Sequence, residues 1–191
     1  MTGIILAGGR NTRIGTDKAF LEINGVRLID RTIAIFQGIF EEIIVVTNSP
    51  LSYLDQNVTI VTDVLENKGP LGGLYTGLFF TFSQYAFACA CDMPFLDGSF
   101  IKYMIEHCTD SKDIVVPYSG DGLQPLHAIY SKKCLPAMLN HLKRDKLKII
   151  DLYKGLKILT IKEDVIETFD KGRKMFLNIN SHADLRHILS A

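Results

Sequence analysis

Short apolar runs recur along the chain, and they restrict its fold more than any other feature of the sequence. The runs occupy residues 3–7, 43–47, 58–62, 86–91 and 114–117. Because few polar residues interrupt them, they are typical of parallel strands that are covered on both faces of a sheet.

The segments between these runs carry apolar residues at helical spacing. Ile29, Ile33 and Phe36 fall on one helical face, and residues 132–144 predict another helix. Strands that alternate with helices predict an α/β fold. We therefore expect a doubly wound, mostly parallel sheet with helices on both faces.

The second half of the chain carries further strand patterns. Residues 123–130 follow a turn, and we expect this strand to break the parallel order. Residues 156–162 and 176–179 are also strand-like, and Ser181 with Asp184 has the spacing of a capping box before a short helix.

The composition narrows the class of protein. The 191 residues contain 21 basic and 21 acidic side chains, so the formal net charge is zero. A neutral chain argues against nucleic-acid or membrane partners, which attract a surplus of Lys and Arg. No apolar run approaches the roughly 20 residues that span a bilayer. The start of the chain lacks the basic residues of a signal peptide. We expect a cytoplasmic protein with one domain over residues 1–191.

A glycine-rich loop follows the first apolar run. Gly8 and Gly9 allow the backbone to approach a ligand closely, and Arg13 and Lys18 follow them. Exposed N–H groups and nearby cations of this kind bind phosphate oxygens. The loop matches neither the dinucleotide fingerprint, G-x-G-x-x-G, nor the Walker A pattern, in which Lys follows the last glycine.

Polar side chains also follow other predicted strands. Asp92 comes directly after residues 86–91, where a carboxylate suits Mg²⁺ because this ion takes one or two carboxylates together with substrate phosphates and water. Asn48 and Asp63 follow two further strands. A carboxylate there suits guanine, whose N1–H and 2-amino group are hydrogen-bond donors.

Several ordered motifs resemble those of the molybdenum cofactor guanylyltransferases. Residues 6–18 match L-A-G-G-x-x-x-R-x-G-x-D-K, and residues 91–96 read C-D-M-P-F-L. The G-P-L-G-G-L stretch at 69–74 and the N-I-N stretch at 178–180 are also similar to elements of that family. His127 lies where the family places its acceptor-side strand, and the sequence leaves its role open between structural and functional.

The resemblance implies a Rossmann-like nucleotidyltransferase fold and the transfer of GMP from GTP to the terminal phosphate of molybdopterin. It further implies that Mg²⁺ is the cofactor. Proteins that deliver the cofactor or mature molybdoenzymes are further partners to expect. By the same resemblance, the nucleotide is bound by Leu6, Ala7, Gly8, Gly9, Arg13, Lys18, Asn48, Asp63, Gly72, Gly73 and Asp92. Arg13, Lys18 and Asp92 are the catalytic residues, and Asp92 and Asn180 are the metal ligands.

The chemistry sets a geometric condition for this assignment. A phosphate acceptor is already an anion near pH 7, so it needs no general base, and its repulsion from the triphosphate must be screened. Lys18 and Asp92 must therefore lie on the same side of the molecule. The same chemistry is shared by a cytidylyltransferase for the same pterin and by a sugar-phosphate nucleotidyltransferase. A non-catalytic GTP-binding regulatory protein is the alternative from another class.

Overall fold

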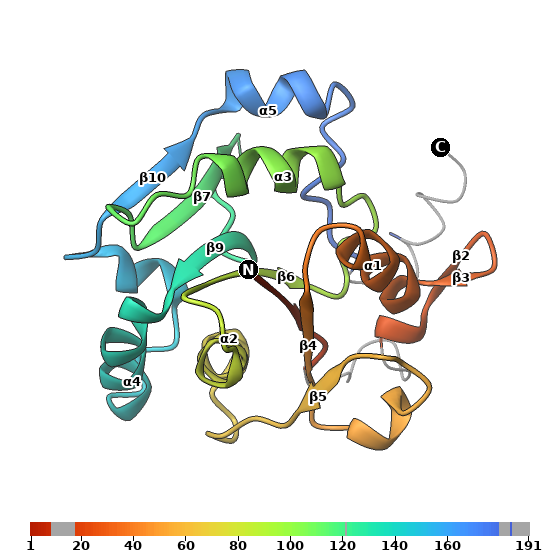
Figure 1. Cartoon of the computed structure of the whole chain (residues 1–191), viewed down its shortest axis with the longest axis horizontal. Helices are drawn as coiled ribbons and strands as arrows, with labels where there is room; N and C mark the ends of the chain where they lie inside the picture. The colour runs from red at the N-terminus through yellow and green to blue at the C-terminus, as the bar shows by residue number, and fades with distance from the viewer. Residues whose placement is uncertain (9–17, 121, 180–183, 185–191) are drawn as a thin grey trace.

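The computed structural model describes residues 1–8, 18–120, 122–179 and 184 (Figure 1). Its centre is an eight-stranded sheet whose main path has the order β10-β7-β9-β6-β1-β4-β5, with β8 paired to β7. The strands of this sheet are β1 (Thr2–Leu6), β4 (Glu42–Val46), β5 (Thr59–Val61), β6 (Tyr85–Ala90), β7 (Ile114–Ser119), β8 (Gly122–Leu123), β9 (His127–Ser131) and β10 (Ile158–Ile161).

Helices connect these strands. The α-helices are α1 (Leu28–Gln37), α2 (Gly69–Phe80), α3 (Gly98–Glu106), α4 (Leu135–Lys143) and α5 (Glu163–Phe169). Short 3₁₀ helices are η1 (Lys18–Phe20), η2 (Pro50–Tyr53), η3 (Lys132–Cys134) and η4 (Ile149–Tyr153). A separate two-stranded sheet pairs β2 (Glu22–Ile23) with β3 (Val26–Arg27).

Most of the central sheet is parallel. β1 pairs with β4 and β6 in parallel, as do β4 with β5 and β7 with β10. β9 is antiparallel to both β6 and β7. The expected break in parallel order is therefore present, but residues 124–126 divide the predicted strand into β8 and β9.

Helices cover both faces of the sheet (Figure 1). Because successive side chains of a strand point to opposite faces, Ile5 packs in one core with Phe36 and Phe100, from α1 and α3. Its neighbour Ile4 packs in the second core with Leu74 and other residues of α2 and α4. The doubly wound α/β architecture is confirmed, and the continuous apolar runs exist because both faces are buried.

Two sequence-based predictions of secondary structure need correction. Residues 176–179 form no strand. Ile179 lies beside Asp92, which follows β6, and β6 is already paired on both sides with β1 and β9, so this segment cannot add to it. The predicted helix over 132–144 is divided into η3 and α4. Ser181 of the predicted capping box lies outside the described residues. Among the residues that the structure describes, no helix is long and apolar enough to span a membrane.

Candidate active site at the carboxyl edge of the sheet

The strand register brings four of the predicted site residues to one edge. Leu6 pairs with Val46 and with Ala90, and Val46 pairs with Val61. The ladder continues for one more residue, because Ala7 N donates to Val46 O at 2.9 Å, Thr47 N to Val61 O at 2.9 Å, and Cys91 N to Leu6 O at 3.1 Å. The next position on these four strands is occupied by Gly8, Asn48, Asp63 and Asp92.

Lys18 and Asp92 lie together at this edge. Lys18 Nζ donates to Asp92 Oδ2 at 3.1 Å, and the two side chains are 23% and 18% exposed. Partial burial strengthens this ion pair relative to one in open solvent, and it leaves both groups accessible to a ligand. The cation and the carboxylate therefore lie on the same side of the molecule, which is the condition that the sequence set.

A late segment of the chain also reaches Asp92. Ile179 N donates to the main-chain oxygen of Asp92 at 2.9 Å, and Ile179 is fully buried. This bond places the end of the described segment beside the predicted metal carboxylate. Asn180, the second predicted metal ligand, lies outside the described residues, as do Gly9 and Arg13.

Asn48 and Asp63 form the second polar pair of the edge. Asn48 Nδ2 donates to Asp63 Oδ2 at 2.9 Å, and Asp63 N donates to Asn48 Oδ1 at 3.4 Å. The other carboxylate oxygen, Asp63 Oδ1, is buried and has no hydrogen-bond partner among the described residues. A buried acceptor without a partner costs about 1–3 kcal/mol. A ligand with N–H donors would remove this cost.

The start of α2 lies beside this acceptor. A Cβ atom added at Gly73 would stand 3.7 Å from Asp63 Oδ1 and 3.4 Å from Leu6 Cδ2. Any larger side chain at Gly73 would therefore fill the space next to Asp63. Gly72 faces elsewhere, because its Cβ would meet Lys68 Cβ at 2.7 Å. Gly72 allows the first turn of α2 to pack, whereas Gly73 keeps the space at Asp63 open.

The residues predicted to bind the nucleotide at the end of β1 differ in their exposure to solvent. Leu6 and Ala7 are buried, whereas Gly8 is exposed. Among these three residues, Gly8 is therefore the one that a ligand can reach from solvent.

The donors present suit a divalent ion that shares its coordination with a substrate. Among the described residues, no group of three or more His, Cys, Asp or Glu side chains could hold a metal ion. Asp92 is a single carboxylate with a partly exposed side chain. One carboxylate that acts together with phosphate and water oxygens is a normal Mg²⁺ environment, so the residues fit this ion.

His127 packs inside the aromatic core of this fold. It is fully buried, and its ring centre lies 5.0 Å from that of Phe87, 5.7 Å from that of Phe100 and 5.2 Å from that of Phe176. Burial lowers the pKa of His127 to about 3, so the ring is neutral near pH 7. Full burial among aromatic rings therefore favours the structural role for His127.

A cavity of about 180 Å³ lies at the same edge, at the end of β7. Ser119, Ile166 and Phe176 are part of its lining, together with Glu167 and Arg173, which pair with each other. The strand order separates this cavity from Asn48 and Asp63, with Asp92 between them.

A family model described as the MobA-like NTP transferase domain matches residues 3–156. The chain belongs to this family. It is 38% identical to the molybdenum cofactor guanylyltransferase of Desulfosudis oleivorans, over 97% of this chain and 92% of that protein. A relative from Peptoclostridium acidaminophilum is 37% identical over 97% of this chain and 86% of its own length.

The fold is also that of a solved structure. Molybdopterin-guanine dinucleotide biosynthesis protein A from Archaeoglobus fulgidus superposes with a TM-score of 0.86, covering 100% of this chain and 97% of that one. Its sequence identity is 23%. The expected nucleotidyltransferase fold is therefore confirmed. The family model and the curated relatives show that the chain is a nucleotidyltransferase.

Proposed function

We propose that this chain transfers GMP from GTP to the terminal phosphate of molybdopterin and releases pyrophosphate, as one cytoplasmic domain over residues 1–191. The observation that carries the proposal is the Lys18–Asp92 pair at the carboxyl edge of the sheet. It occurs in a chain that is 38% identical, over nearly its whole length, to a protein named molybdenum cofactor guanylyltransferase.

The transfer is an in-line displacement at the α-phosphorus of GTP. A bond forms between this phosphorus and an oxygen of the acceptor phosphate, while the bond to the β-phosphate oxygen breaks and pyrophosphate leaves. A divalent ion, proposed here as Mg²⁺ on Asp92 with Asn180, supplies positive charge next to the reacting phosphates. Lys18 and Arg13 neutralise the phosphate oxygens as charge moves to the leaving group.

The guanine base is proposed to lie against Asp63. Asp63 Oδ1 is the buried acceptor without a partner, and Gly73 leaves space beside it. The N1–H and 2-amino donors of guanine match this acceptor. Asn48 holds Asp63 in place through the 2.9 Å hydrogen bond to Oδ2. Leu6, Ala7, Gly8 and Gly9 are proposed to line the nucleoside and the first phosphate.

The order of features along the edge supports a proposal for the side from which the acceptor approaches. Asp63 follows β5 and Asp92 follows β6, while the cavity lies beyond, at β7. Molybdopterin is proposed to approach from the β7 side, opposite the base. Proteins that deliver the cofactor or receive the product are partners in the same proposal, with no role for nucleic acid or membrane.

One experiment tests the assignment. The purified protein is incubated with Mg²⁺, with either GTP or CTP, and with either molybdopterin or a sugar phosphate as the acceptor. Pyrophosphate and the product of transfer are measured. We expect product with GTP and much less with CTP. Preference for CTP would identify a cytidylyltransferase, and product only with a sugar phosphate would identify the second alternative. Binding of GTP without pyrophosphate release would identify a regulatory protein.

A further inference from the structure

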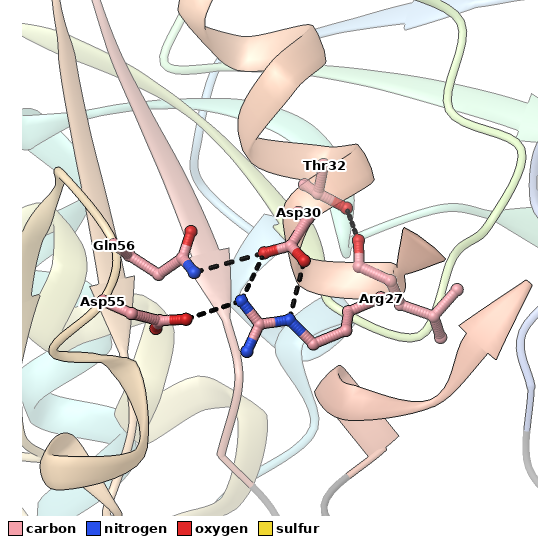
Figure 2. A network of polar contacts seen from close by, with 6 residues as sticks. Arg27, Asp30, Thr32, Asp55 and Gln56 are labelled. Carbon is pink, nitrogen blue, oxygen red and sulfur yellow. Dashed lines mark hydrogen bonds and ion pairs between the residues drawn. The ribbon is translucent and has the colours of Figure 1, made fainter. Parts of the chain in front are cut away.

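Arg27 joins two segments that are distant in the sequence (Figure 2). Its Nε donates to Asp30 Oδ2 at 2.6 Å and its Nη2 to Asp30 Oδ1 at 3.0 Å. Nη2 also donates to Asp55 Oδ2 at 2.7 Å. Gln56 Nε2 donates to Asp30 Oδ1 at 3.2 Å, so Asp30 is bound from both segments. We call Arg27, Asp30, Asp55 and Gln56 the Arg27 network.

An apolar contact joins the same two segments next to this network. The rings of Phe20 and Tyr53 lie 4.9 Å apart between centres, and Tyr53 is fully buried. The guanidinium carbon of Arg27 stands 5.5 Å from the centre of the Phe20 ring. The polar network and the ring contact therefore hold the two segments together side by side.

Each segment carries one part of the proposed nucleotide site. Phe20 ends η1, which begins at Lys18, the cation proposed for the triphosphate. Tyr53 ends η2, which follows Asn48, the partner of Asp63 on the base side. Base and phosphates are joined covalently within GTP, so the two segments must keep a spacing that fits one nucleotide.

We propose that Arg27 is a positioning residue that fixes the spacing between the Lys18 segment and the base-binding segment; this inference rests on the function proposed above. Only a guanidinium has a planar fork that can reach two carboxylates while it lies over an aromatic ring. A lysine keeps the charge and loses this geometry. The role is indirect, because Arg27 acts through Lys18 and Asn48.

The role has a kinetic signature. Misplacement of reacting groups by about 1 Å can cost about 100-fold in rate, because alignment is required in the transition state. We therefore expect Arg27→Met to lower kcat by about tenfold or more while the KM for GTP changes much less. A general loss of folded protein would lower the amount of active enzyme, and it would not produce faster local exchange confined to the two joined segments.

The test combines kinetics with amide hydrogen exchange. Arg27→Met keeps an apolar stem over Phe20, and Arg31→Met removes the same charge from α1 as a matched control. For Arg27→Met, we expect faster exchange in residues 48–56 and slower turnover. Arg27→Lys should recover only part of the wild-type turnover. Arg31→Met should match the wild type in both measurements. Wild-type turnover of Arg27→Met overturns the inference.

The failure of the proposed function can be told apart from the failure of this inference. If the wild-type protein makes no dinucleotide from GTP, the proposed function is wrong, whatever Arg27 does. Amide hydrogen exchange can be measured whether or not the protein is active. Wild-type exchange of residues 48–56 in Arg27→Met overturns the positioning role on its own.

Discussion

At the scale of single residues, the Lys18–Asp92 pair is proposed to stabilise developing charge rather than the fold. Both side chains remain partly accessible to solvent, which screens their attraction and limits what the pair contributes to stability. We predict that Lys18→Ala and Asp92→Ala each lower kcat by about 100-fold or more, as removal of one group that stabilises charge does in other enzymes. Pyrophosphate release measures the loss, and thermal melting checks that the fold persists. Wild-type turnover in either variant would remove that residue from the mechanism.

Asp63 gives a second prediction at this scale, which concerns base selection. Its buried Oδ1 has no partner in the described part of the chain, and hydrogen bonds to charged groups contribute about 1.5–3 kcal/mol. Asp63→Asn should therefore lower kcat/KM for GTP by about 10- to 100-fold and lower that for CTP much less. Steady-state kinetics with both nucleotides provide the measurement. An equal loss with the two nucleotides would show that Asp63 supports the fold of the edge and does not read the base.

At the scale of elements, the sequence predicts those strands that are buried on both faces. Residues 86–91 read as a buried strand because both faces of β6 are covered, and Asp92 follows because a parallel strand ends at the edge where ligands bind. The prediction of a strand at residues 176–179 was wrong. Phe176 packs against the ring of His127, and Ile179 packs with Ile23 and Leu28, whereas β6 has no free edge for this segment. The pattern of apolar residues indicates which segments are buried. It does not indicate whether a neighbouring strand has an unpaired edge.

Two features of the fold were not predicted from the sequence. The β2–β3 hairpin turns at Asn24 and Gly25, which both have positive φ, and Asn-Gly is the usual pair for such a turn. The Arg27 network depends on a contact between residues 28 positions apart, which local patterns do not contain. Lys18 and Asp92 are 74 positions apart, and the sequence predicted only that they share one side of the molecule, because both follow strands whose carboxyl ends lie at one edge.

The packing of α2 on the sheet yields a prediction about an element. A Cβ atom at Gly77 would lie 2.6 Å from Ile4 Cγ2, whereas one at Gly98 in α3 would make ordinary contacts at 3.5 Å. Gly77→Ala should destabilise the protein by about 1–3 kcal/mol through overpacking, despite the better helix propensity of alanine. Gly98→Ala is the matched control and should be neutral or mildly stabilising. Urea unfolding measures both, and equal effects would contradict the close approach of α2.

At the scale of the whole molecule, the sheet separates two main cores, and the proposed site lies at its carboxyl edge. His127 is the first residue of β9, and its ring packs in one of these cores against Phe87 of β6 and Phe100 of α3. The folded protein keeps this ring neutral, because burial holds the pKa of His127 near 3. The ordinary pKa of about 6.5 applies to the unfolded chain.

The stability of the whole protein should therefore fall as the pH falls from about 6.5 toward about 3, because in this window the unfolded chain binds a proton at His127 that the native chain does not. At pH 5 the loss from this residue alone is about 2 kcal/mol. Carboxylates titrate in the same range, so the comparison is between the wild type and His127→Leu. Urea unfolding at pH 7 and pH 5 should show a larger loss for the wild type than for the variant. Equal losses would mean that His127 is protonated in the native protein, and the aromatic core would then have to accommodate a buried cation.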